Sequence, residues 1–172
     1  AGNELYGSVY SRSMGLSCVG LRYFNVFGPR QDPKGPYAAV IPRFVEQALA
    51  GRQLTIFGDG EQGRDFVSVG DVARANLMAS RTAGAAGRVF NIGGGKMRTV
   101  NELGAIVQRV VGREVGAAYL PERPGDVRYS VSDISAAKDV LGWSPEADFG
   151  SALAETIEWY RRNPLPVSAD AS

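Results

Sequence analysis

The sequence contains no histidine and a single cysteine, Cys18, and these two shortages exclude several kinds of active site. Without histidine there is no Ser-His-Asp triad, no cysteine activated by histidine and no histidine metal site. A lone cysteine cannot form a disulfide within the chain. Cys18 lies in a short apolar run, which predicts a buried and unreactive thiol. This use of cysteine is typical of a cytoplasmic protein.

Long hydrophobic runs and an excess of one charge are also missing. No apolar run reaches the roughly 20 residues of a membrane span, and no signal peptide is visible. The 19 basic and 18 acidic residues leave a net charge of +1 with no basic block, so we expect no nucleic-acid and no membrane partner. With 172 residues, 44% of them apolar, the chain can form one domain with a substantial core.

Gly58, Gly60 and Gly63 have the G-x-G-x-x-G spacing of a dinucleotide-binding loop. Such a loop requires a strand before it and a helix that begins inside it. Residues 54–57 look like a strand, but residues 64–69 alternate polar and apolar side chains, which indicates a second strand. We therefore favour a hairpin turn whose glycines adopt positive φ over a phosphate-binding loop.

Hydrophobic spacing and capping residues predict alternating helices and strands, which favours an α/β fold. Helices are expected up to Gly15, over 41–49, from Asp71 as N-cap to Ser80, from a Thr99–Glu102 capping box to Gly112, from Asp133 to Leu141, and over 149–162. Strands are expected over 19–24, 54–57, 64–69, 88–92, 115–120 and 129–132. We expect a loop over 25–37 and a frayed tail over 163–172. The glycine triplet 93–95 follows a strand but lacks the dinucleotide spacing.

Three arginines, Arg30, Arg64 and Arg123, lie outside the expected helices. A guanidinium group suits a pair of diphosphate oxygens, although any one of these arginines taken alone is better explained as a solvated surface charge or a local ion pair. Asn25 taken alone is a turn residue. Tyr23, Phe24 and Phe57 taken alone are core aromatics.

Six stretches in a fixed order carry a resemblance to a known family. They are LRYFNVFGPRQDP, PYAAVIPRF, FGDGEQGRDFVSVGDV, FNIGGG, ERPGDVRYSVSDISAAKDVLGW and the closing helix. Together they resemble the C-terminal half of the extended short-chain dehydrogenase/reductase family, whose members are NAD-dependent epimerases and dehydratases. They are most similar to the epimerases that act on UDP-glucose or UDP-N-acetylglucosamine. The resemblance extends from Ala1 to about Arg162.

The resemblance implies roles for particular residues. Tyr23 and Phe24 would lie beside the nicotinamide of NAD. The implied substrate-binding residues are Asn25 against the sugar nucleotide, Ala39 and Val40 along the diphosphate and uracil, Thr55 and Phe57 at the uracil edge, Arg64 and Arg123 on the diphosphate, and Asp126 on a ribose hydroxyl. No metal is implied. Many relatives carry Thr or Ser in place of Gly63, which predicts a looser turn and weaker binding here.

The family's Tyr-x-x-x-Lys pair and its glycine-rich NAD loop are expected upstream of Ala1. Residues 1–172 would then be a truncated C-terminal half, in which the last strands and helices of a Rossmann sheet are interleaved with a small nucleotide-sugar-binding subdomain. The parent reaction would be epimerisation at C4 by transient hydride transfer to NAD, in a homodimer. The chain alone would be inactive.

Two other interpretations stay open. The chain could derive from a UDP-glucuronate decarboxylase or a dTDP-glucose 4,6-dehydratase. It could also be a nucleotide-sugar-binding module without catalytic activity.

Overall fold

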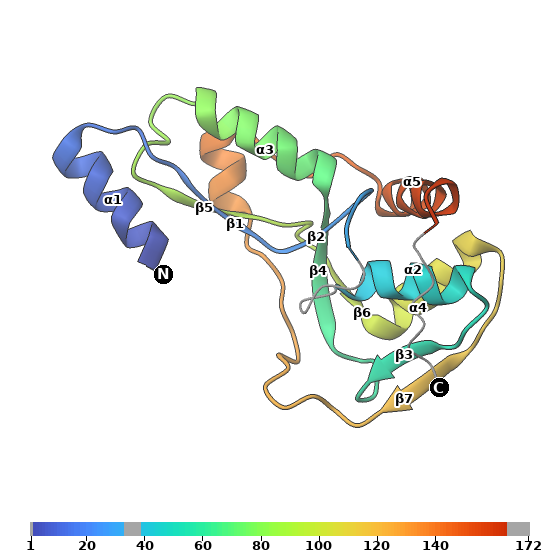
Figure 1. The fold of residues 1–172 in the computed structure, drawn as a ribbon. Coiled ribbons are helices and arrows are strands. Elements are labelled where there is room, and N and C mark those ends of the chain that lie inside the picture. Colours follow the sequence, from blue (N-terminus) through green and yellow to red (C-terminus); the bar gives the residue numbers. More distant parts are fainter. Residues whose placement is uncertain (1, 33–38, 165–172) are drawn as a thin grey trace. The chain divides into compact units, whose positions relative to one another are not determined.

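The computed structural model describes residues 2–32 and 39–164, and it divides the chain into two compact units. The first unit comprises Ala1–Val26, Gly63–Arg98 and Tyr129–Ala147, and the second comprises Phe27–Gln62, Thr99–Arg128 and Asp148–Ser172. Strands and helices alternate along the chain (Figure 1), which confirms the α/β fold class. Whether the units correspond to a Rossmann remnant and a sugar-nucleotide subdomain stays a prediction. In the described part of the chain, no helix is both long and apolar enough to cross a membrane.

The first unit is built on a pair of parallel strands, β1 and β5, with Gly20 opposite Val89 and Tyr23 opposite Ile92. Its strands are β1 (Gly20–Tyr23), β5 (Val89–Ile92) and most of a second sheet in the order β2-β4-β6, formed by Asn25–Phe27, Gly63–Ser68 and Met97–Thr99. Its helices are α1 (Gly2–Met14), α3 (Val69–Arg81) and the π-helical turn η1 (Ala137–Leu141).

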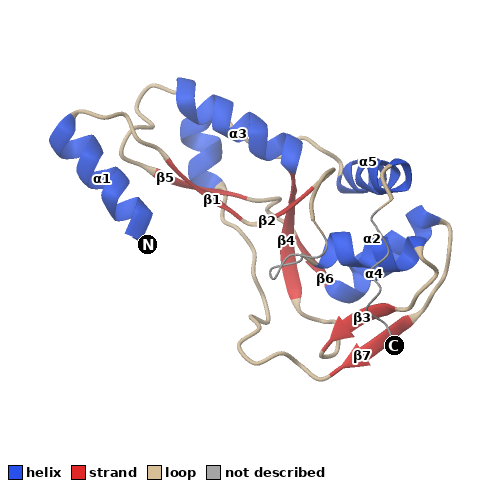
Figure 2. Ribbon diagram, in the orientation of Figure 1, coloured by secondary structure: helices blue, strands red, loops and turns tan. Residues whose placement is uncertain are grey.

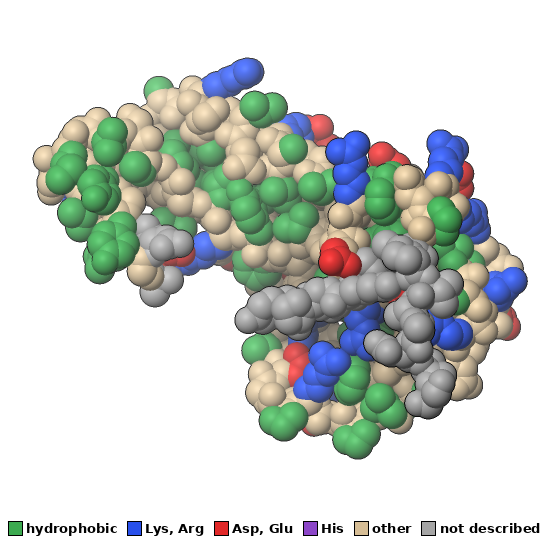
Figure 3. Space-filling view, viewed as in Figure 1, with side chains coloured by type: hydrophobic (Ala, Val, Ile, Leu, Met, Phe, Trp, Pro, Cys, Tyr) green, Lys and Arg blue, Asp and Glu red, His purple; other side chains and the backbone are tan. Residues whose placement is uncertain are grey.

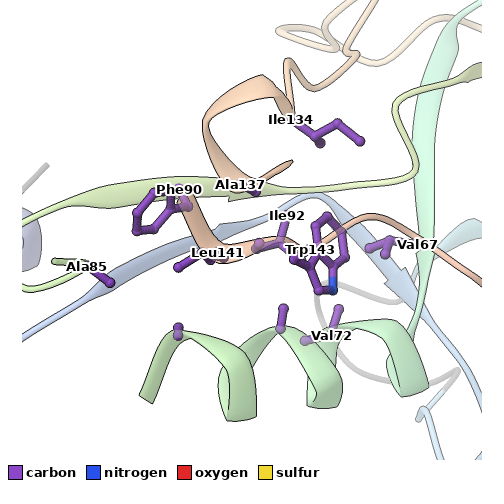
Figure 4. Packing of buried hydrophobic residues seen from close by; sticks show 11 residues of the cluster. Val67, Val72, Ala85, Phe90, Ile92, Ile134, Ala137, Leu141 and Trp143 are labelled. Atoms are coloured by element: carbon purple, nitrogen blue, oxygen red, sulfur yellow. The ribbon is translucent and has the colours of Figure 1, made fainter. Parts of the chain in front are cut away.

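Trp143 fills the centre of the first unit's core (Figure 4). The indole is fully buried, and its Nε1–H donates to the backbone carbonyl of Asp71 at 3.1 Å, so burial leaves no donor unpaired. The cluster around it comprises Val67, Val72, Ala75, Ala79, Ala85, Phe90, Ile92, Ile134, Ala137 and Leu141. These residues come from two segments of the unit, 63–98 and 129–147, and the partly buried Val19, Leu21 and Val26 of the first segment pack against them.

The second unit combines a two-stranded parallel sheet with three helices that pack on one another (Figure 2). The strands are β3 (Leu54–Phe57) and β7 (Ala117–Leu120), and the helices are α2 (Val40–Leu49), α4 (Val100–Val111) and α5 (Phe149–Arg162). Helix α2 contacts β3, α4 and α5. The buried residues of this unit include Ile41, Phe44, Val45, Leu54, Ile56, Leu103, Val107, Leu153, Ile157 and Tyr160.

The helix ends of the second unit follow the local sequence signals. Thr99 and Glu102 form the expected capping box at the start of α4, and Gly112 ends the helix with a φ of 77°. Helix α5 spans Phe149–Arg162 as expected, with the Asp148 carboxylate accepting from the N–H of Ser151.

The expected hairpin around Gly58–Gly63 is wrong. Strand β3 pairs with β7, whereas β4 lies between β2 and β6, so the two strands belong to different sheets. Gly58 and Gly60 have the expected positive φ, but Gly63 lies in β4. A Cβ at Gly63 would fall 2.3 Å from the sulfur of Met97, so this glycine accommodates a close neighbour and does not loosen a turn.

Three local expectations also need correction. Helix α3 begins earlier than expected, with Ser68 as its N-cap in place of Asp71. Residues 25–27 form strand β2, so only the rest of the predicted 25–37 loop remains, and residues 33–38 lie outside the described residues. Cys18 is half-buried and not fully buried. The tail expected to fray lies, from residue 165 onward, outside the described residues.

Candidate functional site

The residues assigned by resemblance divide between the two units. The second unit holds Ala39, Val40, Thr55, Phe57, Arg123 and Asp126, and the first unit holds Tyr23, Phe24, Asn25 and Arg64.

Phe57, the last residue of β3, is the centre of the group in the second unit. The guanidinium carbon of Arg123 lies 3.7 Å from the centroid of the Phe57 ring, a cation–π contact. A second guanidinium, from Arg43 in the first turn of α2, lies 5.8 Å from the same centroid. Ala39 and Val40 stand at the start of this helix, one turn before Arg43. The chain therefore gathers two basic groups around one aromatic ring.

Thr55 lies two residues before Phe57 and projects to the same side of β3. Gln47 of α2 holds it in place, donating from Nε2 to the Thr55 hydroxyl oxygen at 2.9 Å and accepting from the Thr55 N–H at 3.1 Å. Because a hydroxyl that accepts one bond still carries its own proton, Thr55 remains able to donate to a carbonyl group.

Asp126 lies in the turn that follows Arg123. Its N–H donates to the Arg123 carbonyl at 3.2 Å, and Gly125 supplies the positive φ of 82° that the turn requires. Asp126 also lines a small pocket together with Phe57, Gly58, Gln62, Glu122, Val127 and Arg128. The structure thus brings Phe57, Arg123 and Asp126 together, as the resemblance implies.

Arg128, one of the residues that line this pocket, forms an ion pair with Asp59. Arg128 donates to both carboxylate oxygens of Asp59, at 2.7 and 2.8 Å. These bonds, and to a lesser extent a bond from the N–H of Glu61, lower the pKa of the Asp59 carboxyl to about 2. The carboxylate therefore stays ionised at neutral pH and ties Arg128 to the glycine turn.

The glycine turn at residues 58–62 is itself bound to the start of α4. The Gly60 and Gln62 carbonyls accept from the N–H groups of Asn101 and Val100 at 3.0 and 3.2 Å. A Cβ at Gly60 would fall 2.0 Å from the side-chain oxygen of Asn101, which explains this glycine. The first N–H groups of α4 are thus occupied by carbonyl groups, and the stretch does not present a helix N-terminus to a dinucleotide.

In the first unit, Tyr23, Phe24 and Asn25 lie at the carboxyl end of β1. The Phe24 N–H donates to the Ile92 carbonyl of β5 at 3.0 Å, and the exposed Tyr23 side chain donates from its hydroxyl to Asn76 at 2.9 Å. Asn25 is half-buried at the start of β2. The carboxyl ends of parallel strands are where α/β proteins commonly bind ligands, so this position fits the roles implied for the three residues.

Arg64 is half-buried in β4 and donates to the Gly63 carbonyl at 2.9 Å. The next residue, Asp65, has no exposed surface. Its carboxylate accepts from the N–H groups of Gly94, Gly95 and Ser132 at 2.6, 3.1 and 2.9 Å, and from the Ser132 hydroxyl. The glycine triplet is therefore a cradle for an internal carboxylate.

Neighbouring atoms approach the backbone of this cradle so closely that only glycine fits. A Cβ on Gly94 would fall 2.4 Å from the carbonyl oxygen of Phe66, and one on Gly93 would fall 2.8 Å from Asp65. Sequence reasoning missed the buried role of Asp65 and the position of Arg43. The only local signal for Arg43 was a basic residue in the first turn of a helix, where the helix dipole disfavours a cation.

Comparison with known proteins identifies the family. The family model described as "NAD dependent epimerase/dehydratase family" matches residues 3–93 of this 172-residue chain. The chain belongs to the NAD dependent epimerase/dehydratase family. This membership confirms the resemblance that the sequence motifs indicated.

Individual members of this family are similar over nearly the whole chain. A UDP-glucose 4-epimerase from Mycolicibacterium smegmatis is 40% identical over 158 residues, which is 92% of this chain and 50% of that protein. The crystal structure of a Thermotoga maritima UDP-glucose 4-epimerase with UDP-glucose matches with a TM-score of 0.89 and 43% identity, covering 94% of this chain and 52% of that one.

A second solved member is the UDP-N-acetylglucosamine 4-epimerase from Methanobrevibacter ruminantium M1, in complex with UDP-N-acetylmuramic acid. It matches with a TM-score of 0.90 and 43% identity, over 94% of this chain and 52% of that one. The chain spans about half the length of the curated relatives it matches.

The family description names NAD, and the described residues fit only one edge of that cofactor. Tyr23 and Phe24, at the carboxyl end of β1, offer aromatic surface where a nicotinamide could lie. The G-x-G-x-x-G stretch does not fit the pyrophosphate, because the N–H groups of the helix it contacts are bonded to Gly60 and Gln62. We therefore assign it no cofactor-binding role.

Proposed function

We propose that this chain carries the nucleotide-sugar-binding part of an NAD-dependent UDP-sugar 4-epimerase. The observation that carries the proposal is the arrangement in the second unit, where the Arg123 guanidinium lies 3.7 Å from the Phe57 ring beside the pocket lined by Asp126. A guanidinium binds phosphate oxygens in pairs, and a carboxylate accepts from ribose hydroxyls. Membership of the epimerase/dehydratase family supports the same assignment.

The proposed residue roles are given for each unit by itself. From the second unit, Arg123 binds the diphosphate, Asp126 a ribose hydroxyl, and Thr55 and Phe57 the uracil edge, with Ala39 and Val40 alongside. From the first unit, Arg64 binds the diphosphate, Asn25 the sugar nucleotide, and Tyr23 and Phe24 lie beside the nicotinamide.

The proposed reaction inverts C4 of the sugar, and bound NAD supplies the hydride acceptor. The residues of this chain bind and orient the sugar nucleotide for that step. The 172 residues contain no Tyr-x-x-x-Lys pair, the acid/base pair that the resemblance implies. We therefore expect the chain as given to bind its ligand without turning it over.

Isothermal titration calorimetry with UDP-glucose and UDP-N-acetylglucosamine tests the proposal. We expect the wild-type chain to bind, and an Arg64→Ala, Arg123→Ala double variant to lose at least about tenfold in affinity, because both diphosphate contacts are removed. The matched control is Arg52→Ala, Arg81→Ala, which removes one exposed arginine from each unit. Equal affinities of the two double variants, or no binding by a folded wild-type chain, would contradict the proposal.

Titration with dTDP in parallel separates the proposal from its alternative. A clear preference for UDP favours the epimerase, and a preference for dTDP favours a dehydratase such as a dTDP-glucose 4,6-dehydratase. The same family includes both kinds of enzyme. A UDP-glucuronate decarboxylase would share the UDP preference but favour the glucuronate form of the sugar.

We further propose that the parent protein is a homodimer that uses α1. This helix exposes a set of apolar side chains over its length, visible as the hydrophobic surface of α1 in Figure 3: Leu5, Tyr6, Val9, Tyr10 and Met14. Soluble monomers rarely leave such a contiguous apolar face uncovered. Sedimentation analysis should show that the chain self-associates and that the double variant Leu5→Ser, Met14→Ser associates more weakly. A chain that is monomeric at all concentrations would contradict the proposed dimer.

A further inference from the structure

Two arginines from different parts of the second unit converge on one ring. The guanidinium carbons of Arg123 and Arg43 lie 3.7 and 5.8 Å from the centroid of Phe57. Arg123 follows β7, whereas Arg43 belongs to the first turn of α2, so the fold itself brings the two groups together. The 5.8 Å separation is near the limit of about 6 Å for a cation–π contact. The contact with the ring therefore stabilises this position of Arg43 only weakly.

The position of Arg43 is electrostatically unfavourable. Burial, and next to it the positive charge of Arg123, lower the pKa of the Arg43 guanidinium, while Glu46 acts in the opposite direction. Arg43 also lies at the positive end of the α2 dipole, in a first turn that contains no acidic residue. Glu46 is shared, because its carboxylate accepts from Arg52 at 2.9 Å.

Two other arginines of this unit are matched directly to carboxylates. Arg128 binds both oxygens of Asp59, and Arg52 binds Glu46 at 2.9 Å. The pair formed by Arg43 and Arg123 differs, because the repulsion between the two positive charges is an electrostatic cost to the folded chain. A multiply charged anion between or beside them would remove that cost.

We infer that Arg43 is a further diphosphate-binding residue, which acts together with Arg123 on the phosphate oxygens of a nucleoside diphosphate. The inference rests on the proposed function and deepens it by adding a residue that the family motifs did not assign. Phe57 holds the Arg123 guanidinium, Arg43 lies on the same ring at the longer distance, and the neighbouring pocket receives the nucleoside. Arg43 is then selective for charge and indifferent to the base.

Calorimetric titrations of the whole chain with UDP, uridine and inorganic pyrophosphate test this role. We expect Arg43→Gln to weaken binding of UDP and pyrophosphate about tenfold and to leave uridine unchanged, because only the charged contact is lost. Arg43→Lys, which keeps the charge, should recover part of the loss. Arg113→Gln is the matched control, since it removes the same charge from an exposed residue of the same unit and should leave all three affinities unchanged.

The outcomes separate the inference from the proposed function. If UDP binds and Arg43→Gln has no effect, or weakens UDP and uridine equally, the inference is wrong and the function survives. If UDP does not bind the folded wild-type chain, the function fails, and the Nε–H NMR signal of Arg43 decides the inference. A shift of that signal on adding pyrophosphate, abolished by Arg123→Gln, supports the paired anion site, and an unmoved signal overturns it.

Discussion

Asp65 belongs to the first unit and Asp59 to the second, and their carboxylates have different surroundings. Asp65 is completely buried, and among the described residues it accepts from backbone N–H groups and a serine hydroxyl. Asp59 is exposed, and its main partner is the guanidinium of another exposed side chain, Arg128.

The difference shows which charges hold the fold and which are available to a ligand. Removing a buried acceptor leaves several N–H groups unpaired, whereas water replaces either member of an exposed ion pair. The first unit therefore uses Asp65 to fix its backbone. In the second unit, Arg123 at the Phe57 ring and Arg128 at the neighbouring pocket are exposed, where a ligand can meet them.

The largest effect that this comparison predicts comes from Asp65→Asn. One acceptor becomes an amide donor that faces N–H groups, so we expect a loss of about 3 kcal/mol in the free energy of unfolding. Urea denaturation measures this loss. The control is Asp59→Asn, for which we expect a much smaller loss in the free energy of unfolding. Equal losses for the two variants would remove the distinction between buried and exposed carboxylates.

Gly94→Ala should destabilise the same cradle by about 1–3 kcal/mol, because the new methyl group would meet the Phe66 carbonyl and the Asp65 carboxylate. Gly70→Ala is the matched control in the same unit. Its Cβ would have its nearest neighbour at 3.8 Å, in the first turn of α3, so we expect a gain of up to about 1 kcal/mol. Thermal unfolding measures the stability of both variants. If neither alanine lowers the unfolding temperature, the close packing around Gly94 does not contribute to stability as described.

A cap in the second unit should have an intermediate effect. Thr99→Ala removes the hydroxyl that accepts from the Glu102 N–H at 3.1 Å, and we expect a loss of about 1 kcal/mol. Thr99→Ser keeps the acceptor and should be nearly neutral. If the two variants unfolded at the same denaturant concentration, the claim that the Thr99 hydroxyl stabilises the fold would be wrong.

The smallest effect concerns Asp59 and pH. Because its pKa is lowered from 3.8 to about 2, the pair with Arg128 stabilises the fold above pH 4 and loses that contribution as the pH falls toward 2. NMR titration of the Asp59 carboxyl carbon should give a midpoint near 2, and Arg128→Gln should move it back toward 3.8. An unchanged midpoint in the variant would show that Arg128 is not the cause.

Local sequence signals predicted most of the helices and strands. The capping box at Thr99–Glu102, Gly112 and the apolar spacing of α5 depend on neighbours within a few residues, and the structure confirms them. Sheet pairing depends on distant residues. Strands β3 and β4 adjoin in sequence, but β3 finds its partner in β7, which no pattern within the stretch could indicate.

The site was less accessible to sequence reasoning than the fold. Motif resemblance named Phe57, Arg123 and Asp126, which the structure places around one ring and pocket. Arg43 and Asp65 were missed, since a burial state and a shared ring are properties of the folded chain. The ligand roles of all these residues stay predictions.

NMR mapping of UDP binding on the isotope-labelled chain tests the central claim most directly. The account predicts shifts at Thr55, Phe57, Arg123 and Asp126 of the second unit and at Arg64 of the first, while the Trp143 indole signal in the buried core stays unmoved. Binding that shifts other residues and spares these, or no shift in a folded chain at millimolar UDP, would contradict it.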